Sequence, residues 1–125
     1  MSDTMTMKIH PTHELKCGQI AQFTVFENKV FLQPCDGTVP IGIVVAVSEQ
    51  YTNGEWYREA TIDFGRKIHI TTEYDCKVSY PVNATLYVNS EGKLTPIREI
   101  FSCPAVAMVV TPPTALDANL TVIWF

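Results

Sequence analysis

The sequence has little charge, and the charge that it has is not basic. Charged residues make up 18% of the 125 residues, and the 13 acidic and 9 basic side chains give a formal net charge of −4. Charged residues usually make up about a quarter of a protein. A protein that binds the phosphate backbone of nucleic acid needs a basic face, so we expect no nucleic-acid partner. With a hydrophobic content of 46%, the shortage of charge suggests that a partner covers part of the surface.

Signals of membrane insertion and of metal binding are also missing. No apolar run approaches the roughly 18 residues that a membrane span requires, and residues 1–12 lack the apolar core of a signal peptide. The four cysteines, Cys17, Cys35, Cys76 and Cys103, form no CxxC pair and no Cys/His zinc spacing. We therefore expect no membrane partner, no metal, and reduced thiols in a protein made in a cytosol.

Motifs that carry catalytic chemistry are absent as well. The chain has no G-x-S-x-G, no S-x-x-K, no phosphate-binding glycine loop and no dinucleotide fingerprint. Of its three histidines, His10 and His13 lie near the N-terminus and His69 lies in a segment with one wet face. An enzyme would depend on Glu73 and Asp75, which no second acidic cluster accompanies. We predict a non-enzymatic protein without a cofactor or a small-molecule substrate.

No segment keeps a helical period beyond two turns, which leaves a pattern of strands. Short apolar runs alternate with Gly, Pro and Asn turns at the spacing typical of β-sandwiches and barrels. The clearest unit is residues 84–95, which read as strand, Asn-Ser-Glu-Gly turn and strand. We predict an all-β fold in which residues 17–125 form a single small antiparallel β-barrel or β-sandwich with little helix. Residues 1–16 are predicted to be an extended, flexible N-terminal arm, ordered only where something holds it.

Two segments carry more specific expectations. Residues 39–47 form the most apolar run and are predicted to be a strand buried on both faces, with Gly42 at a bulge or a close backbone approach. Residues 66–74 alternate between apolar and polar side chains. This alternation predicts an antiparallel strand with Ile68 on the core face and His69 on the wet face.

Residues 48–59 are predicted to be a polar loop around an Asn-Gly turn. Aromatic side chains on a loop either cover the core or form a contact patch. We expect Trp56 to cover the core, while both roles stay open for Tyr51 and Tyr57.

Two segments of the chain resemble each other in the order of their parts. Residues 31–45 and residues 86–110 each contain a short strand, a turn with an acidic residue before glycine, and a buried apolar run, in that order. Either a hairpin-plus-strand unit is duplicated, or two small β units use the same turns independently. The sequence leaves both readings open.

The segments that carry a family likeness are Tyr80-Pro81, Leu86-Tyr87-Val88, Glu91-Gly92-Lys93-Leu94-Thr95, residues 106–110, Leu120-Thr121-Val122 and, earlier, residues 36–44. In these features the chain from Gly18 onward resembles the small β-rich head decoration (cement) proteins of tailed bacteriophages. The resemblance implies a structural virion protein that binds the lattice of the major capsid protein from outside and stabilises it. It also implies a homotrimer whose N-terminal arm orders on the shell.

Seven residues are candidate contacts with the capsid or with other subunits: Met5, Met7, Ile9, His10 and Pro11 in the arm, and Tyr51 and Tyr57. Apolar arm residues would gain order on a lattice, and many weak contacts would add up through avidity. The alternative is another β-barrel virion component (a tail, adaptor or fibre part) or a carbohydrate-binding module. A carbohydrate site would need Tyr51, Trp56 and Tyr57 to be exposed and coplanar.

Overall fold

The computed structural model describes residues 3–125, in which it contains ten strands and no helix. The first five strands are β1 (Thr4–Lys8), β2 (Ile20–Phe26), β3 (Lys29–Pro34), β4 (Gly42–Thr52) and β5 (Glu55–Asp63). The other five are β6 (Ile68–Thr71), β7 (Thr85–Val88), β8 (Leu94–Thr95), β9 (Ala107–Thr111) and β10 (Leu120–Trp124). The predicted all-β, antiparallel class is confirmed, and within this range no helix is long and apolar enough to cross a membrane.

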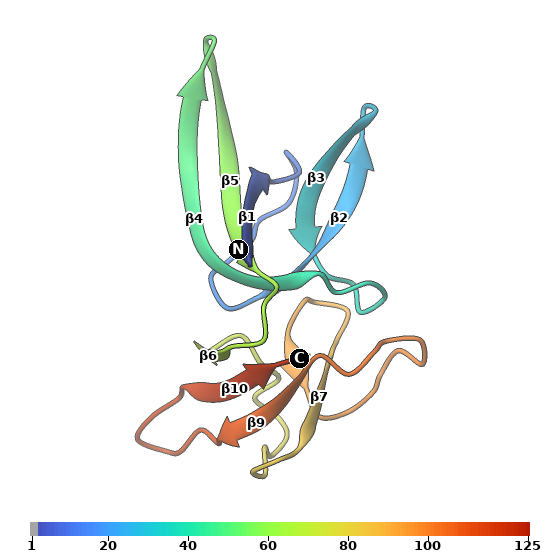
Figure 1. Ribbon diagram of the computed structural model, residues 1–125, viewed down its shortest axis with the longest axis vertical. Helices are drawn as coiled ribbons and strands as arrows, with labels where there is room; N and C mark the ends of the chain where they lie inside the picture. Colours follow the sequence, from blue (N-terminus) through green and yellow to red (C-terminus); the bar gives the residue numbers. More distant parts are fainter. Residues whose placement is uncertain (1–2) are drawn as a thin grey trace.

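The strands form two curled five-stranded sheets, which lie one above the other along the long axis (Figure 1). Their strand orders, β1-β5-β4-β2-β3 and β6-β10-β9-β7-β8, are the same order repeated. The pairing registers repeat too. Ala21 pairs with Gly42, and Leu86 pairs with Ala107, with the same offset in residue number for both partners. The two halves of the chain are therefore two copies of one β unit in the structural sense.

Backbone hydrogen bonds outside the strands follow the same offset. The N–H of Val44 donates to the carbonyl of Gln19 at 2.9 Å, and the N–H of Val109 donates to the carbonyl of Ala84 at 3.0 Å. Gly18 has a positive φ of 92°, and Asn83 at the corresponding place has a φ of 71°. Glycine and asparagine are the residues that adopt this conformation most readily. A local backbone requirement is thus met twice by different side chains.

The alignment of residues 31–45 with residues 86–110, which the sequence suggests, is partly correct. Its buried runs, residues 41–45 and 106–110, do correspond, since they lie at β4 and β9. Its short strands do not, because the counterpart of β7 is β2 and not β3. Turns with similar residues at different places in the unit produced the wrong alignment.

A hydrophobic core joins the two sheets. Ile20 and Ile43 of the first sheet pack in one cluster with residues of the second, among them Leu86, Val109 and Val122. At this junction the N–H of Ile20 donates to the carbonyl of Gly92 at 2.9 Å. A second cluster lies inside the first sheet and contains Ile9, Leu15, Ala21, Leu32, Val44, Ala60 and Ile62.

Part of the extended N-terminal arm that the sequence predicts for residues 1–16 is held against the first sheet. Residues Thr4–Lys8 form β1, which pairs antiparallel with β5 over its whole length. The N-terminal segment lacks a strong strand pattern of its own, but the edge of β5 holds it by backbone hydrogen bonds. Met5 and Met7 pack against the core cluster inside the first sheet. Residues 1–2 of the predicted arm lie outside the described residues.

The polar loop predicted for residues 48–59 is instead the upper part of a long hairpin. Strands β4 and β5 stay paired up to Thr52 and Glu55, where a two-residue turn connects them. Asn53 and Gly54 have φ values of 55° and 80° there, which is the geometry of tight hairpin turns. The prediction that residues 39–47 are buried on both faces is also wrong, because Val45 and Val47 are exposed.

The two faces of strand β6 are exchanged relative to the prediction: the side chains expected in the core face solvent. Ile68 and Ile70 are 62% and 66% exposed, while Thr71 is buried and His69 faces inward beside Asp63. The register with β10 places His69 opposite buried Val122. The Thr71 hydroxyl donates to the carbonyl of Gly18 at 3.0 Å, so the inward polar side chain has a partner. A one-residue change of register exchanges the two faces of a strand.

Gly42 lies at a close backbone approach, as the sequence predicts. A Cβ added there would lie 2.6 Å from the carbonyl oxygen of Asp63, and backbone atoms move less easily than side chains. We expect Gly42→Ala to lower the free energy of unfolding by about 2 kcal/mol, measured by urea denaturation. Gly54→Ala is the control: no atom lies within 4 Å of its added Cβ, and its positive φ alone should cost about 1 kcal/mol. Equal losses in both variants would contradict the steric explanation.

Candidate functional site

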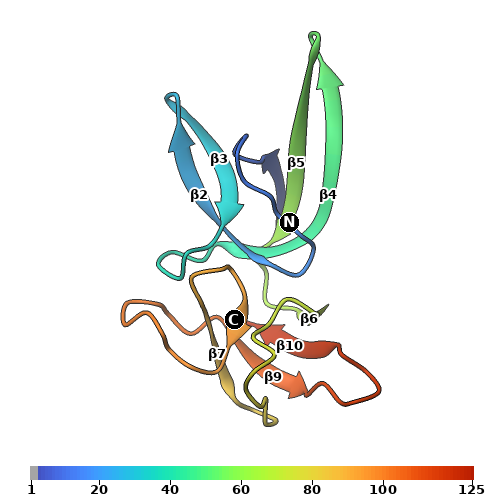
Figure 2. The ribbon, with the colours of Figure 1, turned by 180° about the vertical axis from the view of Figure 1, so that it is seen from behind.

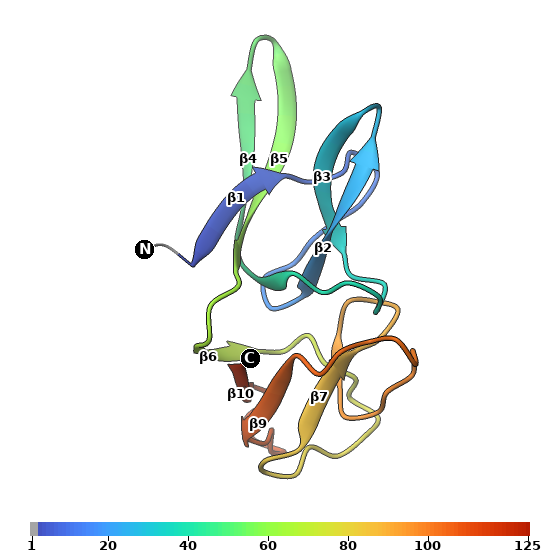
Figure 3. The same ribbon diagram turned by 45° about the vertical axis from the view of Figure 1, so that its right-hand side comes forward.

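A hollow lies between the two hairpins of the first sheet. Hairpin β2–β3 and hairpin β4–β5 diverge upward, with β1 between them (Figures 1 and 3). We call the space between them the hairpin cleft; its volume is about 810 Å³. It is lined by Met7, Lys8, Ile9, Pro11, Lys29, Val30, Phe31, Glu49, Glu55, Trp56, Tyr57 and Arg58.

The cleft exists because β2 and β4 separate soon after they start. They share only the pairs Ile20 with Ile43 and Ala21 with Gly42. A bulge then interrupts β4 between Val44 and Ala46, and a bulge bends its strand. Beyond it, each hairpin continues alone, and the view from behind shows the same divergence (Figure 2).

Exposed aromatic rings mark the wall formed by β4 and β5. Tyr51 and Trp56 are a cross-strand pair, 59% and 71% exposed. Their ring centroids lie 5.1 Å apart at an interplanar angle of 52°. The prediction that Trp56 covers the core is therefore wrong. Tyr57 follows Trp56 on the opposite face of the strand, where the ammonium of Lys8 lies 4.3 Å from its ring centroid.

The wall formed by β2 and β3 is apolar too. Val25 pairs with Val30, and both side chains are exposed. On the other face, the ring of His10 lies 4.7 Å from the ring of Phe26 and 6.2 Å from that of Phe31. These rings fix the chain where it leaves β1 and turns toward residue 13.

Arg58 holds the floor of the cleft in place. Its guanidinium donates to the carbonyl oxygen of Pro11 at 3.3 Å and to that of His13. Pro11 has no N–H to donate to a sheet, so the strand begun by β1 ends there. The floor is thus a fixed turn of the backbone.

The structure brings four of the seven candidate contact residues to the hairpin cleft, namely Met7, Ile9, Pro11 and Tyr57. Ile9 is only 3% exposed and serves mainly the core. The other three do not line the cleft: Met5 packs against the core, the ring of His10 lies tilted against that of Phe26, and Tyr51 lies beside Trp56. Sequence reasoning missed Val30 and Phe31 of the second wall, which give no local signal of exposure because they stand in the apolar run Val30-Phe31-Leu32.

A second cluster of polar residues lies between the sheets, where Asp63 ends β5. Its buried carboxylate accepts the N–H of Gly65 at 2.9 Å and the ammonium of Lys67 at 3.3 Å. Burial raises the pKa of Asp63, but these two donors and the nearby His69 lower it more, so the pKa lies below its ordinary value. Nε2 of His69 lies 3.8 Å from the carboxylate and has no hydrogen-bond partner. Burial lowers the pKa of His69, and the charge of Asp63 offsets only part of this.

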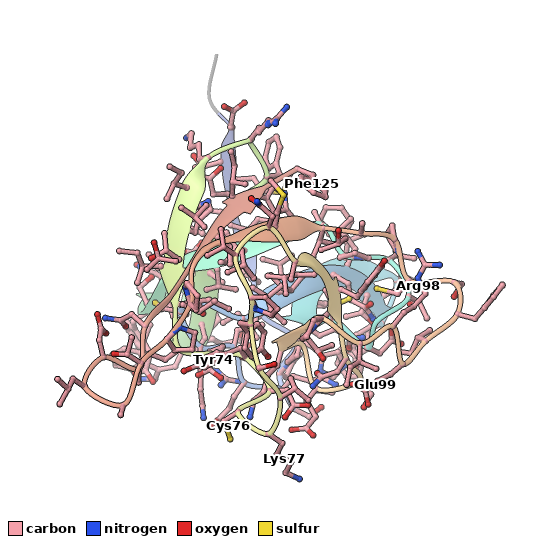
Figure 4. The ribbon with its side chains drawn as sticks, turned by 90° about the horizontal axis from the view of Figure 1, so that it is seen from below. Tyr74, Cys76, Lys77, Arg98, Glu99 and Phe125 are labelled. Atoms are coloured by element: carbon pink, nitrogen blue, oxygen red, sulfur yellow. The ribbon has the colours of Figure 1, made fainter. Side chains whose placement is uncertain are left out.

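The residues that an enzyme was expected to use do not share one cavity. Asp75 lines a cavity of about 300 Å³ at the lower end of the second sheet, with Tyr74, Cys76, Lys77, Asn89, Glu91, Lys93 and Glu99. His69 lines a different cavity, next to Gly18 and Asn119. Figure 4 shows Cys76, Lys77 and Glu99 along one side of the lower end, away from Phe125. Within residues 3–125, no group of three His, Cys, Asp or Glu side chains lies close enough to hold a metal ion.

All four thiols are free, Cys17 and Cys76 on the surface and Cys35 and Cys103 in the core. Burial raises the pKa of the Cys35 thiol to about 11. A buried thiol with a raised pKa is a packing group and not a nucleophile.

No protein-family model matches the chain, and no curated protein matches it.

The lowered pKa of His69 predicts a loss of stability in acid. Below about pH 6.5 the unfolded chain binds a proton at this histidine more readily than the folded protein, so unfolding becomes easier as pH falls. Met5 occupies the place in the first sheet that His69 occupies in the second, opposite Ile62 and Val122 respectively. We therefore expect His69→Met to be accommodated and to flatten the dependence of the unfolding free energy on pH between about 7 and 5. Urea denaturation at several pH values measures it, with exposed His13→Met as control. An unchanged slope in His69→Met would refute this origin.

Proposed function

We propose that the protein is a non-enzymatic virion protein that binds the outer surface of a bacteriophage capsid through the hairpin cleft and stabilises the shell. The observation that carries this proposal is the difference between two copies of one β unit. Strand β4 has 11 residues where β9 has 5, and β2 has 7 where β7 has 4. The shorter copy closes its sheet without the extensions. The extra length of the first copy therefore serves something other than the core.

The side chains on these extensions are suited to binding a protein. Trp56 and Tyr51 are of the residue types that carry most of the binding energy at interfaces, and they are exposed. The apolar side chains of Val30 and Phe31, which line the same cleft as Trp56, would exclude water from such a contact. Repetition over a shell would add many contacts of this kind by avidity.

A carbohydrate-binding module is the alternative that one observation favours, namely the exposed pair of Tyr51 and Trp56. The rings are tilted by 52°, and Tyr57 points to the opposite face. A flat stacking platform for a sugar would need the rings to be coplanar, so the pair fits an irregular protein surface better.

We infer that copies of the chain associate as a trimer through a second apolar surface, on the outer face of β6 and β10. Ile68 pairs with Ile123, and Ile70 pairs with Thr121. In the first copy the same face is polar: the hydroxyls of Thr6 and Thr61 lie 2.8 Å apart. Since the fold tolerates threonine at this face, the isoleucines support a contact between subunits.

Sedimentation tests the trimer. We expect a trimer for the unchanged protein and a monomer for Ile70→Lys, because a charge buried in an apolar contact without a partner is strongly unfavourable. Thr6→Lys at the corresponding place of the first sheet is the matched control and should stay trimeric. Sedimentation is also measured at about 100 times the protein concentration used for shell binding. If the unchanged protein is still a monomer there, the proposed trimer is wrong.

Binding to expanded capsid shells tests the function. We expect the purified protein to add to the shells in a fixed ratio and to raise their melting temperature. Trp56→Ala should weaken this binding by about tenfold or more, without changing the melting temperature of the free protein. Leu116→Ala removes a fully exposed side chain elsewhere and should bind normally. If the unchanged protein binds no shell, the proposed function is wrong.

A further inference from the structure

The tip of hairpin β4–β5 contains a pair of residues that can react with each other. The chain has several asparagines, and only Asn53 precedes a glycine. Asparagine is among the thermolabile residues of proteins. When glycine follows, its backbone nitrogen can attack the side-chain amide carbon, because glycine has no Cβ to obstruct the approach. Asn53 and Gly54 form the two-residue turn between Thr52 and Glu55, so the reactive pair lies at the end of the candidate site.

Nothing in residues 3–125 shields this pair. Asn53 and Gly54 are exposed, and apart from its chain neighbours no atom lies within 4 Å of a Cβ added to Gly54. In the same range no hydrogen bond involves the side-chain amide of Asn53 or the N–H of Gly54. The amide carbon and the backbone nitrogen are therefore both accessible.

The other asparagines precede residues that have a side chain. Asn28 occupies an exposed two-residue turn in hairpin β2–β3 with a φ of 65°, but Lys29 follows it. The side-chain oxygen of Asn89 accepts the N–H groups of Glu91 and Lys93, which fixes its amide. Asn28 is thus a matched comparison within the same chain, since it shares the turn and the exposure of Asn53 and lacks the glycine.

The tip of this hairpin opens without disturbing the core. Every residue from Tyr51 to Trp56 is exposed, and segments with few buried contacts open locally at little cost in free energy. In the closed turn, Asn53 and Gly54 are held at φ values of 55° and 80°. Ring closure requires the backbone of Asn53 to rotate out of this geometry. The reaction therefore starts from the open tip, and a contact that holds the tip closed slows it.

We propose that Asn53 converts to isoaspartate in the free protein and that this covalent change inactivates the hairpin for shell binding. The nitrogen of Gly54 forms a bond to Cγ of Asn53, the Cγ–Nδ2 bond breaks, and ammonia leaves with the proton of that nitrogen. Water then opens the resulting cyclic imide at either of its carbonyls. Opening at Cγ gives aspartate. Opening at the backbone carbonyl gives isoaspartate, in which the main chain runs through Cγ.

Isoaspartate adds a methylene group to the backbone and a negative charge to the tip. Turn type and loop length fix the register of a hairpin. A lengthened turn no longer fits the pairing of Thr52 with Glu55 and of Tyr51 with Trp56. The new carboxylate also adds to the charge of Glu55, which is close to it in the chain. The aromatic pair is thereby displaced from its place on the hairpin.

Shell binding protects Asn53 from this conversion. This part rests on the proposed function, in which the shell contacts Tyr51 and Trp56 and so keeps the tip closed. A ligand that binds only the closed form lowers the population of the open form. Bound copies therefore keep Asn53, while free copies convert and lose the ability to bind.

Incubation of the purified protein in warm, mildly alkaline buffer tests the conversion. Peptide mass spectrometry should find deamidation, accompanied by release of ammonia, at Asn53 and not at Asn28. The incubated protein should bind expanded shells about tenfold or more weakly than fresh protein, the loss expected when Trp56 is displaced.

Two variants separate this cause from general ageing. Asn53→Gly gives a Gly-Gly turn, which suits two-residue hairpins, and has no amide to lose. It should bind shells equally well before and after incubation. Asn28→Gly is the matched control in the other hairpin and should lose shell binding as the unchanged protein does.

The outcomes separate this inference from the proposed function. Conversion of Asn53 no faster than that of Asn28 overturns the modification. Conversion that leaves shell binding unchanged overturns the inactivation, and equal conversion of free and shell-bound copies overturns the protection. If fresh protein binds no shell, the proposed function is wrong and the modification is still decided by the mass measurement. Faster hydrogen exchange of the Glu55 amide after incubation then reports the disrupted hairpin, and unchanged exchange refutes it.

Discussion

A single residue pair determines where the first sheet is closed and where it is open. Ile9 bridges Leu32 and joins the first strand of the sheet to its last, and both side chains are buried in the same cluster. Below this pair the side chains pack into a core. Above it no strand connects the walls, and the two hairpins continue separately. The cleft is thus a consequence of the height at which the sheet closes.

The second sheet closes in the same way, through a parallel bridge between Tyr74 and Leu94. Its hairpins, however, end close to the bridge, and the small cavity there is lined mainly by charged and polar side chains. One chain therefore contains the same closure with and without extended hairpins. The comparison separates the residues that the fold needs from those that it does not, as sequence conservation would do in a family.

Much of the fold could be predicted from local chemistry. The absence of hydrophobic residues at helical spacing predicted the all-β class. Gly42 within an apolar run predicted a close backbone approach. The Asn53-Gly54 turn was recognised, but the polar residues around it were assigned to a loop. A strand that extends beyond the core has no buried face to impose alternation, so its sequence resembles a loop. Only pairing with β5 distinguishes the two.

The faces of β6 could not be predicted, because their choice depends on tertiary contacts. Ile68 and Ile70 favour the core by every local rule, and His69 and Thr71 favour water. Buried Val122 opposite His69 and the bond from Thr71 to the carbonyl of Gly18 fix the reverse. A position at which local preference and global structure disagree is often functional, which agrees with a subunit contact on this face.

The residues that line the cleft could be predicted only in part, because their exposure also depends on tertiary structure. Apolar residues in a polar segment, such as Met7 and Pro11, stand out in composition. Val25 and Val30 do not, because each stands next to another apolar residue, Phe26 or Phe31, as in an ordinary core strand. Their exposure depends on how far the hairpin extends past the Ile9 bridge, a length that no local pattern encodes.

Open strand edges beside apolar side chains also carry a risk of aggregation. The chain places charges where these edges end: Lys29 next to the turn of hairpin β2–β3, and Glu55 next to the turn of hairpin β4–β5. Charged side chains of this kind oppose pairing between identical edges. Arg58 adds to this by holding the turn at Pro11 against the base of the cleft. These charges and the fixed turn at Pro11 therefore oppose aggregation of identical copies through the open edges.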